Sequence, residues 1–184
     1  MKMSIPRESL AHFVTGLADN HLQDGKSVES PVASVLPRAL DRLEYCFSHV
    51  KLKYYISGNQ VTFNHLNSDH LATLIYFISN ELRANDYQLI AEKFGYINKI
   101  LNGLDVYPHV QMPDIFLLVH PVGAVIGNAD YQDFLVVYQQ VTIGALSDVY
   151  PRLGRGTVLW SGATVPRCSV ELLVEIMLCM GQTR

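Results

Sequence analysis

Two side chains with complementary acid–base chemistry, Asp105 and His120, lie fifteen residues apart in the second half of the 184-residue chain. A carboxylate that accepts a hydrogen bond from one imidazole nitrogen fixes the tautomer of the ring and stabilises its protonated form. The other nitrogen is then free to act as a general base. The alternative is that His120 is a structural histidine satisfied by the backbone, and the two residues alone favour that alternative.

The segment that must position these side chains repeats every six residues. Units open with an aliphatic residue and usually carry a small residue nearby. They begin at Val137 and Ile143 and, after an excursion of the chain, at Leu153, Leu159 and Val165. A period of six is neither helical nor a simple strand alternation. It is typical of a parallel β-helix, in which each hexad forms one side of a triangular coil. The alternative is an ordinary glycine-rich β meander.

A β-helix of this kind would bring Asp105 and His120 together. One coil of three hexads has about eighteen residues. Residues nearly one coil apart then lie one above the other, at the strand spacing of about 4.8 Å. The spacing therefore predicts that the Asp105 carboxylate reaches the His120 ring.

The first fifty residues have the pattern of two helices. Residues 4–20 place Leu10, Phe13, Val14 and Leu17 on one face, with Pro6 near the start. A second helix is predicted to run to about residue 49, with Ser30 as N-cap and Pro31 at the first helical position. Pro37 lies inside it and predicts a kink or break.

Residues 51–101 are predicted to form a hairpin and two further helices. The hairpin turns at Ser57–Gln60 between two β-prone runs. A strongly apolar core helix runs from Leu71 to about Arg83, capped by Ser68 or Asp69. The last helix spans residues 87–101 and stops at Asn102-Gly103. We also expect a core position for the tyrosines of this region, namely Tyr54, Tyr55, Tyr76, Tyr87 and Tyr96.

These patterns predict an α+β protein with a mainly α-helical N-terminal domain, residues 1–103, and a β-helical domain, residues 104–184. The net charge of −3 and the lack of a basic run argue against a nucleic-acid partner. No apolar run suggests a signal peptide or a membrane span. The three cysteines, Cys46, Cys168 and Cys179, have no metal-binding spacing, which favours a reducing cytoplasm and no metal site.

Three segments of the β region resemble the serine acetyltransferase family of the hexapeptide-repeat acyltransferases. Asp105-Val-Tyr-Pro108 matches the family's Asp-aliphatic-His-Pro segment, and His120 stands where that family has its catalytic histidine, just before Pro121–Gly127. The run from Val137 to Gly144 is similar to the family's aliphatic-Tyr-Gln-Gly-Val-Thr-aliphatic-Gly segment. The resemblance is close over residues 104–165, about a third of the chain.

The resemblance implies a left-handed β-helix and an O-acetyltransferase that uses acetyl-coenzyme A (acetyl-CoA) as donor. His120 would be the general base and Asp105 its orienting partner, with direct transfer to a small hydroxyl acceptor such as serine or a sugar. The family binds its donor in a groove between neighbouring subunits of a trimer, which implies a homotrimer or a dimer of trimers. The donor-binding segments would be Gly144, Ala145, Ser161, Gly162 and Ala163. For each of these the alternative is a small residue that the corner of the fold requires.

The chain departs from the family where the family binds serine. An acidic residue that holds the amine of serine precedes the family's catalytic histidine, and Val119 takes its place here. A family Arg-His-Pro segment is replaced by Val149-Tyr-Pro151. Apolar residues in these places favour a less charged acceptor, such as a sugar, over free serine.

Two further departures concern the coils. Gln140 takes a place usually held by Gly, and the coil around residues 130–134 is one residue short, which predicts a bulge or bent corner. The hexads stop after Val170, and residues 171–184 suggest either a capping helix or a changed reading frame that removes coils of the donor groove. The alternative function is therefore a non-catalytic or decayed trimeric β-helix protein. A metal-dependent β-helix enzyme is a third reading, but His109 and His120 are the only histidines of the β region.

Overall fold

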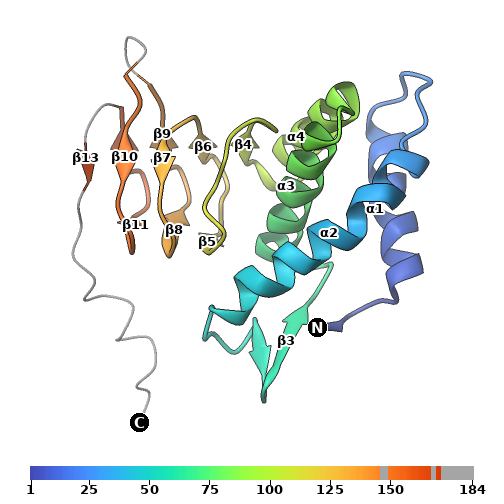
Figure 1. Ribbon diagram of the computed structural model, residues 1–184, viewed down its shortest axis with the longest axis horizontal. Coiled ribbons are helices and arrows are strands. Elements are labelled where there is room, and N and C mark those ends of the chain that lie inside the picture. Colours follow the sequence, from blue (N-terminus) through green and yellow to red (C-terminus); the bar gives the residue numbers. More distant parts are fainter. Residues whose placement is uncertain (146–148, 167–168, 171–184) are drawn as a thin grey trace.

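The computed structural model describes residues 1–145, 149–166 and 169–170. Its helices are gathered at one end of the molecule, and the strands of the second half stack beyond them (Figure 1). Strand β4 packs against helix α4, and β5 packs against α3, so the two halves are in contact. The helical region followed by parallel strands confirms the predicted fold class.

The first half contains helices and one small sheet. The helices are α1 (Arg7–His21), α2 (Glu29–Ser48), α3 (Ser68–Ala84) and α4 (Gln88–Asn102). In the sheet, β3 (Gln60–Phe63) lies between β1 (Lys2–Met3) and β2 (Ile56–Ser57). Ser57 pairs antiparallel with Gln60, so the predicted hairpin is confirmed. None of the helices in the described ranges combines the length and apolarity needed to cross a bilayer.

The helix ends follow local chemistry, with two corrections. Helix α2 begins at Glu29 with Val28 as its N-cap, so the prediction of Ser30 as N-cap was wrong. The N-cap of α3 is Asn67, whose side chain accepts hydrogen bonds from the backbone N–H groups of Asp69 and His70; the prediction of Ser68 or Asp69 as cap was wrong. Helix α4 ends as predicted, with Gly103 in the left-handed conformation at φ 65°. Helix α2 continues through Pro37 without the predicted break, because apolar residues before and after Pro37 are buried in the core.

Helix α3 lies at the centre of the helical half, and its residues from His70 to Asn80 are all buried. This confirms the prediction of a core helix. The prediction for the tyrosines was right only for Tyr55 and Tyr76, which are buried. The other three (Tyr54, Tyr87 and Tyr96) are exposed at the surface, where the hydroxyl stays in water.

The second half is a parallel β-helix whose three sheets are the three faces of a prism. The sheet orders are β12-β9-β6-β4, β11-β8-β5 and β13-β10-β7. Within each sheet, every pair of neighbouring strands is parallel. Parallel pairing excludes the meander, whose neighbouring strands would be antiparallel. The strands are β4 (Asp105–Val106), β5 (Phe116–Val119), β6 (Val125–Ile126), β7 (Asp130–Tyr131), β8 (Leu135–Tyr138), β9 (Thr142–Ile143), β10 (Arg152–Leu153), β11 (Val158–Leu159), β12 (Thr164–Val165) and β13 (Ser169–Val170).

The aliphatic residue of each hexad points into the prism. On the β12-β9-β6-β4 face, Val165, Ile143, Ile126 and Val106 form a buried column with exposures of 5% or less. At the corners, Gln140 and Phe134 have left-handed backbone with φ of 57° and 65°. These two corners therefore bend in a conformation that glycine ordinarily supplies, near the places where a bent corner was expected. The predicted capping helix at residues 171–184 lies outside the described residues.

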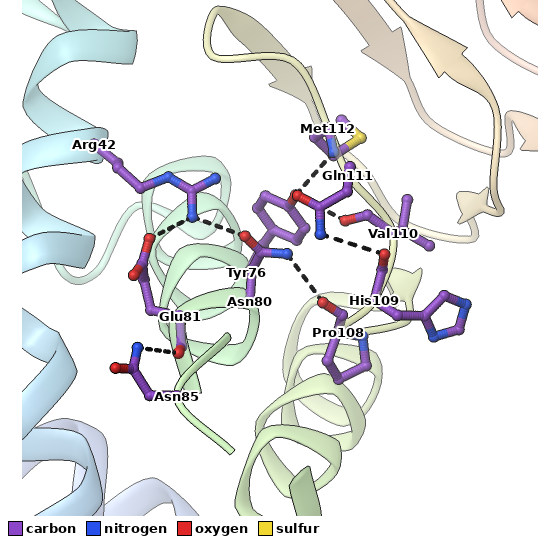
Figure 2. A network of polar contacts seen from close by, with 10 residues as sticks. All are labelled: Arg42, Tyr76, Asn80, Glu81, Asn85, Pro108, His109, Val110, Gln111 and Met112. Atoms are coloured by element: carbon purple, nitrogen blue, oxygen red, sulfur yellow. Dashed lines mark hydrogen bonds and ion pairs between the residues drawn. The ribbon is translucent and has the colours of Figure 1, made fainter. Parts of the chain in front are cut away.

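A polar network ties the helices to the segment between β4 and β5 (Figure 2). The Arg42 guanidinium donates to the side chains of Asn80 at 2.8 Å and Glu81 at 2.7 Å. The Asn80 amide donates in turn to the carbonyl oxygen of Pro108 at 3.0 Å. Helices α2 and α3 thereby hold the start of the β-helix in a fixed position.

Candidate active site

His120 lies at the corner that follows β5, at the start of the β12-β9-β6-β4 face. Its backbone is held on both sides: its N–H donates to Asp69 Oδ1 at 3.1 Å, and its carbonyl accepts from the Val122 N–H at 2.7 Å. The residue has φ of 48°, a left-handed conformation uncommon for a residue with a side chain. Its imidazole is 77% exposed. The backbone is therefore fixed while the ring is accessible, which is the arrangement that a general base needs.

Asp69 reaches His120 from the helical half. It belongs to the first turn of α3, where its backbone N–H is held by the Asn67 side chain at 3.0 Å. Its side chain is only 14% exposed, and Oδ2 lies 3.9 Å from His120 Nδ1. One carboxylate oxygen thus holds the backbone of His120 while the other faces its ring.

Asp105 does not make the predicted contact with His120; its Oδ2 accepts from Lys99 Nζ at 2.6 Å. The Asp105 carboxylate raises the pKa of Lys99 above its ordinary value, chiefly through this hydrogen bond. The pairing register gives the reason. Asp105 pairs with Val125 rather than with the corner at His120, because the coil is longer here than eighteen residues.

A pocket of about 300 Å³ opens beside Asp105, between α4 and β4. Its lining includes Tyr96 and Lys99 of α4, and Asp105, Tyr107 and Pro108 from the start of the β-helix. Both charged groups of the Lys99–Asp105 ion pair therefore line this pocket.

The residues next to His120 form an apolar row along one edge of the prism. Val119 pairs with Tyr138 on the next coil, and Tyr138 stacks on Trp160 with ring centroids 4.8 Å apart. Trp160 is 57% exposed. Ser161 follows Trp160 as His120 follows Val119, so the two corners lie on the same edge, two coils apart, at a separation of about 10 Å.

The five predicted donor-binding residues flank the β12-β9-β6-β4 face. Ser161, Gly162 and Ala163 precede β12 on the His120 edge, whereas Gly144 and Ala145 follow β9 on the opposite edge. Gly162 has φ of 76°, so the backbone itself favours glycine there. Gly144 has no positive φ, and a Cβ built on it would meet no atom of the described residues within 4 Å. The described fold thus gives a reason for Gly162 but none for Gly144.

The free thiol of the described ranges, that of Cys46, is inaccessible. Cys46 is buried, its thiol donates to the Phe116 carbonyl at 3.1 Å, and burial raises the pKa of the thiol to about 12. Within those ranges no three side chains of His, Cys, Asp or Glu are grouped so that they could hold a metal ion.

Asp69 is the residue of this site that sequence reasoning missed. Asn67, Ser68 and Asp69 are all good helix-capping residues, so the sequence assigns them a structural role. The approach of Asp69 to His120 depends on how α3 packs against β5, and no local pattern reports that packing.

Comparison with known proteins links this architecture to one group of enzymes. No family model matches the chain. Serine acetyltransferase of Synechocystis sp. (strain ATCC 27184 / PCC 6803 / Kazusa) is 27% identical over 99 residues, which cover 51% of this chain and 40% of that protein. The chain thus spans less than half the length of this relative.

Solved structures of serine acetyltransferases superpose on most of the chain. A complex of serine acetyltransferase with CoA matches with a TM-score of 0.65 and 15% identity over 85% of this chain and 67% of that one. The serine acetyltransferase of Vibrio cholerae O1 biovar El Tor N16961 matches with a TM-score of 0.66 and 17% identity, over 85% of this chain and 64% of that one. The Neisseria gonorrhoeae enzyme in complex with serine matches with a TM-score of 0.64 and 16% identity, over 84% of this chain and 66% of that one. The chain therefore has the fold of the serine acetyltransferases, a helical region followed by a parallel β-helix, and resembles one of them in sequence over half its length.

Proposed function

We propose that the protein is an O-acetyltransferase that uses acetyl-CoA and transfers the acetyl group directly to a small hydroxyl acceptor. The observation that carries the proposal is the position of His120. It occupies the place of the family's catalytic histidine within the matched motifs, and its exposed ring stands on a rigid corner of the prism. The similarity to serine acetyltransferases, one of which was solved with CoA, supports the donor.

The reaction needs one base and no covalent intermediate on the enzyme. A ring nitrogen of His120 takes the proton of the acceptor hydroxyl as the oxygen attacks the thioester carbonyl. The tetrahedral intermediate then collapses, the carbon–sulfur bond breaks, and the CoA thiolate takes up the proton from the imidazolium. The products are an acetyl ester and CoA with its free thiol.

The donor is proposed to lie along the β12-β9-β6-β4 face, between the edge that carries Ser161, Gly162 and Ala163 and the edge that carries Gly144 and Ala145. The outward residues of that face include Thr142 and Thr164, both exposed. Small and short polar side chains let an extended pantetheine arm approach the backbone. By the same resemblance we propose a trimer, in which a neighbouring subunit would complete the groove.

The acceptor is proposed to be less charged than serine. The row formed by Val119, Tyr138 and Trp160 lies directly beside His120 and offers apolar and aromatic surface. Stacked aromatic rings of this kind suit the apolar face of a sugar ring better than a free amino acid zwitterion.

An acceptor screen tests the proposal. Purified protein is incubated with acetyl-CoA and either serine or a panel of sugars and other hydroxyl compounds, and release of the CoA thiol is measured. We expect thiol release that depends on the acceptor, with a sugar giving a higher kcat/KM than serine. Serine turnover equal to or faster than that of every other acceptor would contradict the apolar acceptor site.

One observation favours a second candidate, a non-catalytic β-helix protein. Asp105, the expected partner of the base, is paired with Lys99 instead. This candidate predicts neither acceptor-dependent thiol release nor binding of acetyl-CoA in a calorimetric titration.

A further inference from the structure

We infer that Asp69, a residue of the helical half, is the positioning residue for His120 in place of Asp105. The inference rests on the proposed function insofar as it gives His120 a catalytic role. It goes beyond that function because it assigns the carboxylate to a different domain and a different segment of the chain.

The Asp69 carboxylate approaches His120 at two points. Asp69 Oδ1 accepts the backbone N–H of His120 at 3.1 Å, and Oδ2 stands 3.9 Å from Nδ1 of the ring. The second distance is longer than a hydrogen bond. Because the ring is 77% exposed, a small rotation of its side chain closes the gap without moving the backbone. Catalytic hydrogen bonds are often long in the absence of substrate and shorten in the complex.

Asp69 is itself held rigidly. The side chain of Asp69 is 14% exposed. Asp69 lies in the first turn of α3, where the N-cap residue Asn67 accepts the Asp69 N–H at 3.0 Å. A fixed carboxylate next to Nδ1 favours the tautomer with the proton on Nδ1, which leaves Nε2 free to accept a proton.

The Asp105 carboxylate is already paired with Lys99. Its Oδ2 is 2.6 Å from Lys99 Nζ, and its backbone is fixed by the pairing with Val125. Among the carboxylates that the structure describes, only that of Asp69 lies within 4.0 Å of a ring nitrogen of His120.

The test compares Asp69→Asn and Asp105→Asn in the full chain. Asparagine at position 69 keeps an oxygen for the His120 N–H but loses the charge that faces the ring. We expect kcat to fall about 10- to 100-fold in Asp69→Asn with an unchanged KM for acetyl-CoA, and a change of less than about threefold in Asp105→Asn. Glu29→Gln is the matched control, because Glu29 is also a first-turn acidic residue but belongs to α2.

A spectroscopic signature separates this inference from the proposed function. Long-range 1H–15N correlation spectra of the His120 ring are recorded at about pH 8.5, where imidazoles are ordinarily neutral. We expect the Nδ1–H tautomer in the wild type and in Asp105→Asn, and mainly Nε2–H in Asp69→Asn.

The acetyl-transfer assay tests the proposed reaction, and the tautomer spectra test the role of Asp69, so a negative result in one does not decide the other. The predicted tautomers without any acetyl transfer would leave the contact standing and overturn the proposed reaction. Acetyl transfer with a tautomer that Asp69→Asn does not change would overturn the role of Asp69. A raised KM for the acceptor with an unchanged tautomer would also overturn it, because Asp69 would then bind substrate rather than position the base.

Discussion

At the scale of single residues, His120 of the candidate site and His70 of the core have different environments and therefore different chemistry. His120 has an exposed ring beside a carboxylate. His70, one position after Asp69, is 1% exposed and packs among the rings of Phe47, Tyr55 and Phe63. Its Nδ1 accepts the Asn64 N–H at 3.1 Å, so its proton is on Nε2 and the ring is neutral. Burial lowers the pKa of His70 to about 4.

The low pKa of His70 predicts a loss of stability in mild acid. The unfolded chain binds a proton on His70 below about pH 6.5, whereas the folded protein does so only below about pH 4. The stabilisation that comes from neutral His70 is therefore complete above pH 6.5. The free energy of unfolding decreases by roughly 3 kcal/mol as the pH falls to about 4. Urea unfolding measured across this range checks the slope.

The matched variants for this prediction are His70→Phe and His12→Gln. Phenylalanine cannot take up a proton, so His70→Phe should flatten the dependence between pH 6.5 and 4. His12 is exposed, and its replacement should leave the slope as in the wild type. An unchanged slope in His70→Phe would show that other groups cause it.

At the scale of elements, two glycines on neighbouring coils separate the demands of the fold from those of a ligand. Gly127 follows β6, and Gly144 follows β9 at the same corner one coil later. A Cβ on Gly127 would lie 2.8 Å from the carbonyl oxygen of Ile143, whereas one on Gly144 would meet no described atom within 4 Å. The same corner therefore tolerates a methyl group on one coil and not on the other.

We predict that Gly127→Ala lowers the free energy of unfolding by about 1–3 kcal/mol, because the strands β6 and β9 must separate to admit the methyl group. Gly144→Ala should change stability by less than about 0.5 kcal/mol. Thermal unfolding of both variants measures the difference.

Gly144→Ala also tests the proposed donor site. If acetyl-CoA lies against this corner, the added methyl group should weaken its binding in calorimetry while stability is kept. An unchanged affinity would place the donor elsewhere.

A further prediction at this scale concerns the contact between α3 and the segment before β5. The Tyr76 hydroxyl donates to the Val110 carbonyl at 3.0 Å and accepts from the Met112 N–H at 2.9 Å (Figure 2). Tyr76→Phe leaves both buried backbone groups without a partner and should cost about 2 kcal/mol of stability. Tyr96→Phe, at an exposed site on α4, is the control and should be neutral. Equal stability of the two variants would contradict this prediction.

At the scale of the whole molecule, the sequence predicts the parts that depend on local repetition. The six-residue period of aliphatic residues predicted the β-helix, because each hexad forms one side of a coil whatever lies next to it. The stop at Gly103 and the hairpin at Ser57–Gln60 were predicted for the same reason, since turn residues act locally.

The candidate site was predicted only in part, because its contacts join distant segments. The matched motif proposes His120 as the base, and the sequence predicted its partner one coil below, on the assumption of eighteen residues per coil. The actual register pairs Asp105 with Val125. Asp69 comes from fifty-one residues before His120, and only the packing of α3 on β5 brings it there.

The catalytic role of His120 is the central claim, and the most direct test is the rate of acetyl transfer by His120→Ala relative to the wild type. The rate is measured with the best acceptor of the screen, and the acetyl-CoA affinity of both proteins is measured by calorimetry. Loss of the general base should lower kcat by roughly 10²- to 10⁴-fold while the affinity for acetyl-CoA stays within about twofold. A variant that binds acetyl-CoA and transfers acetyl groups at the wild-type rate would show that His120 is not the base.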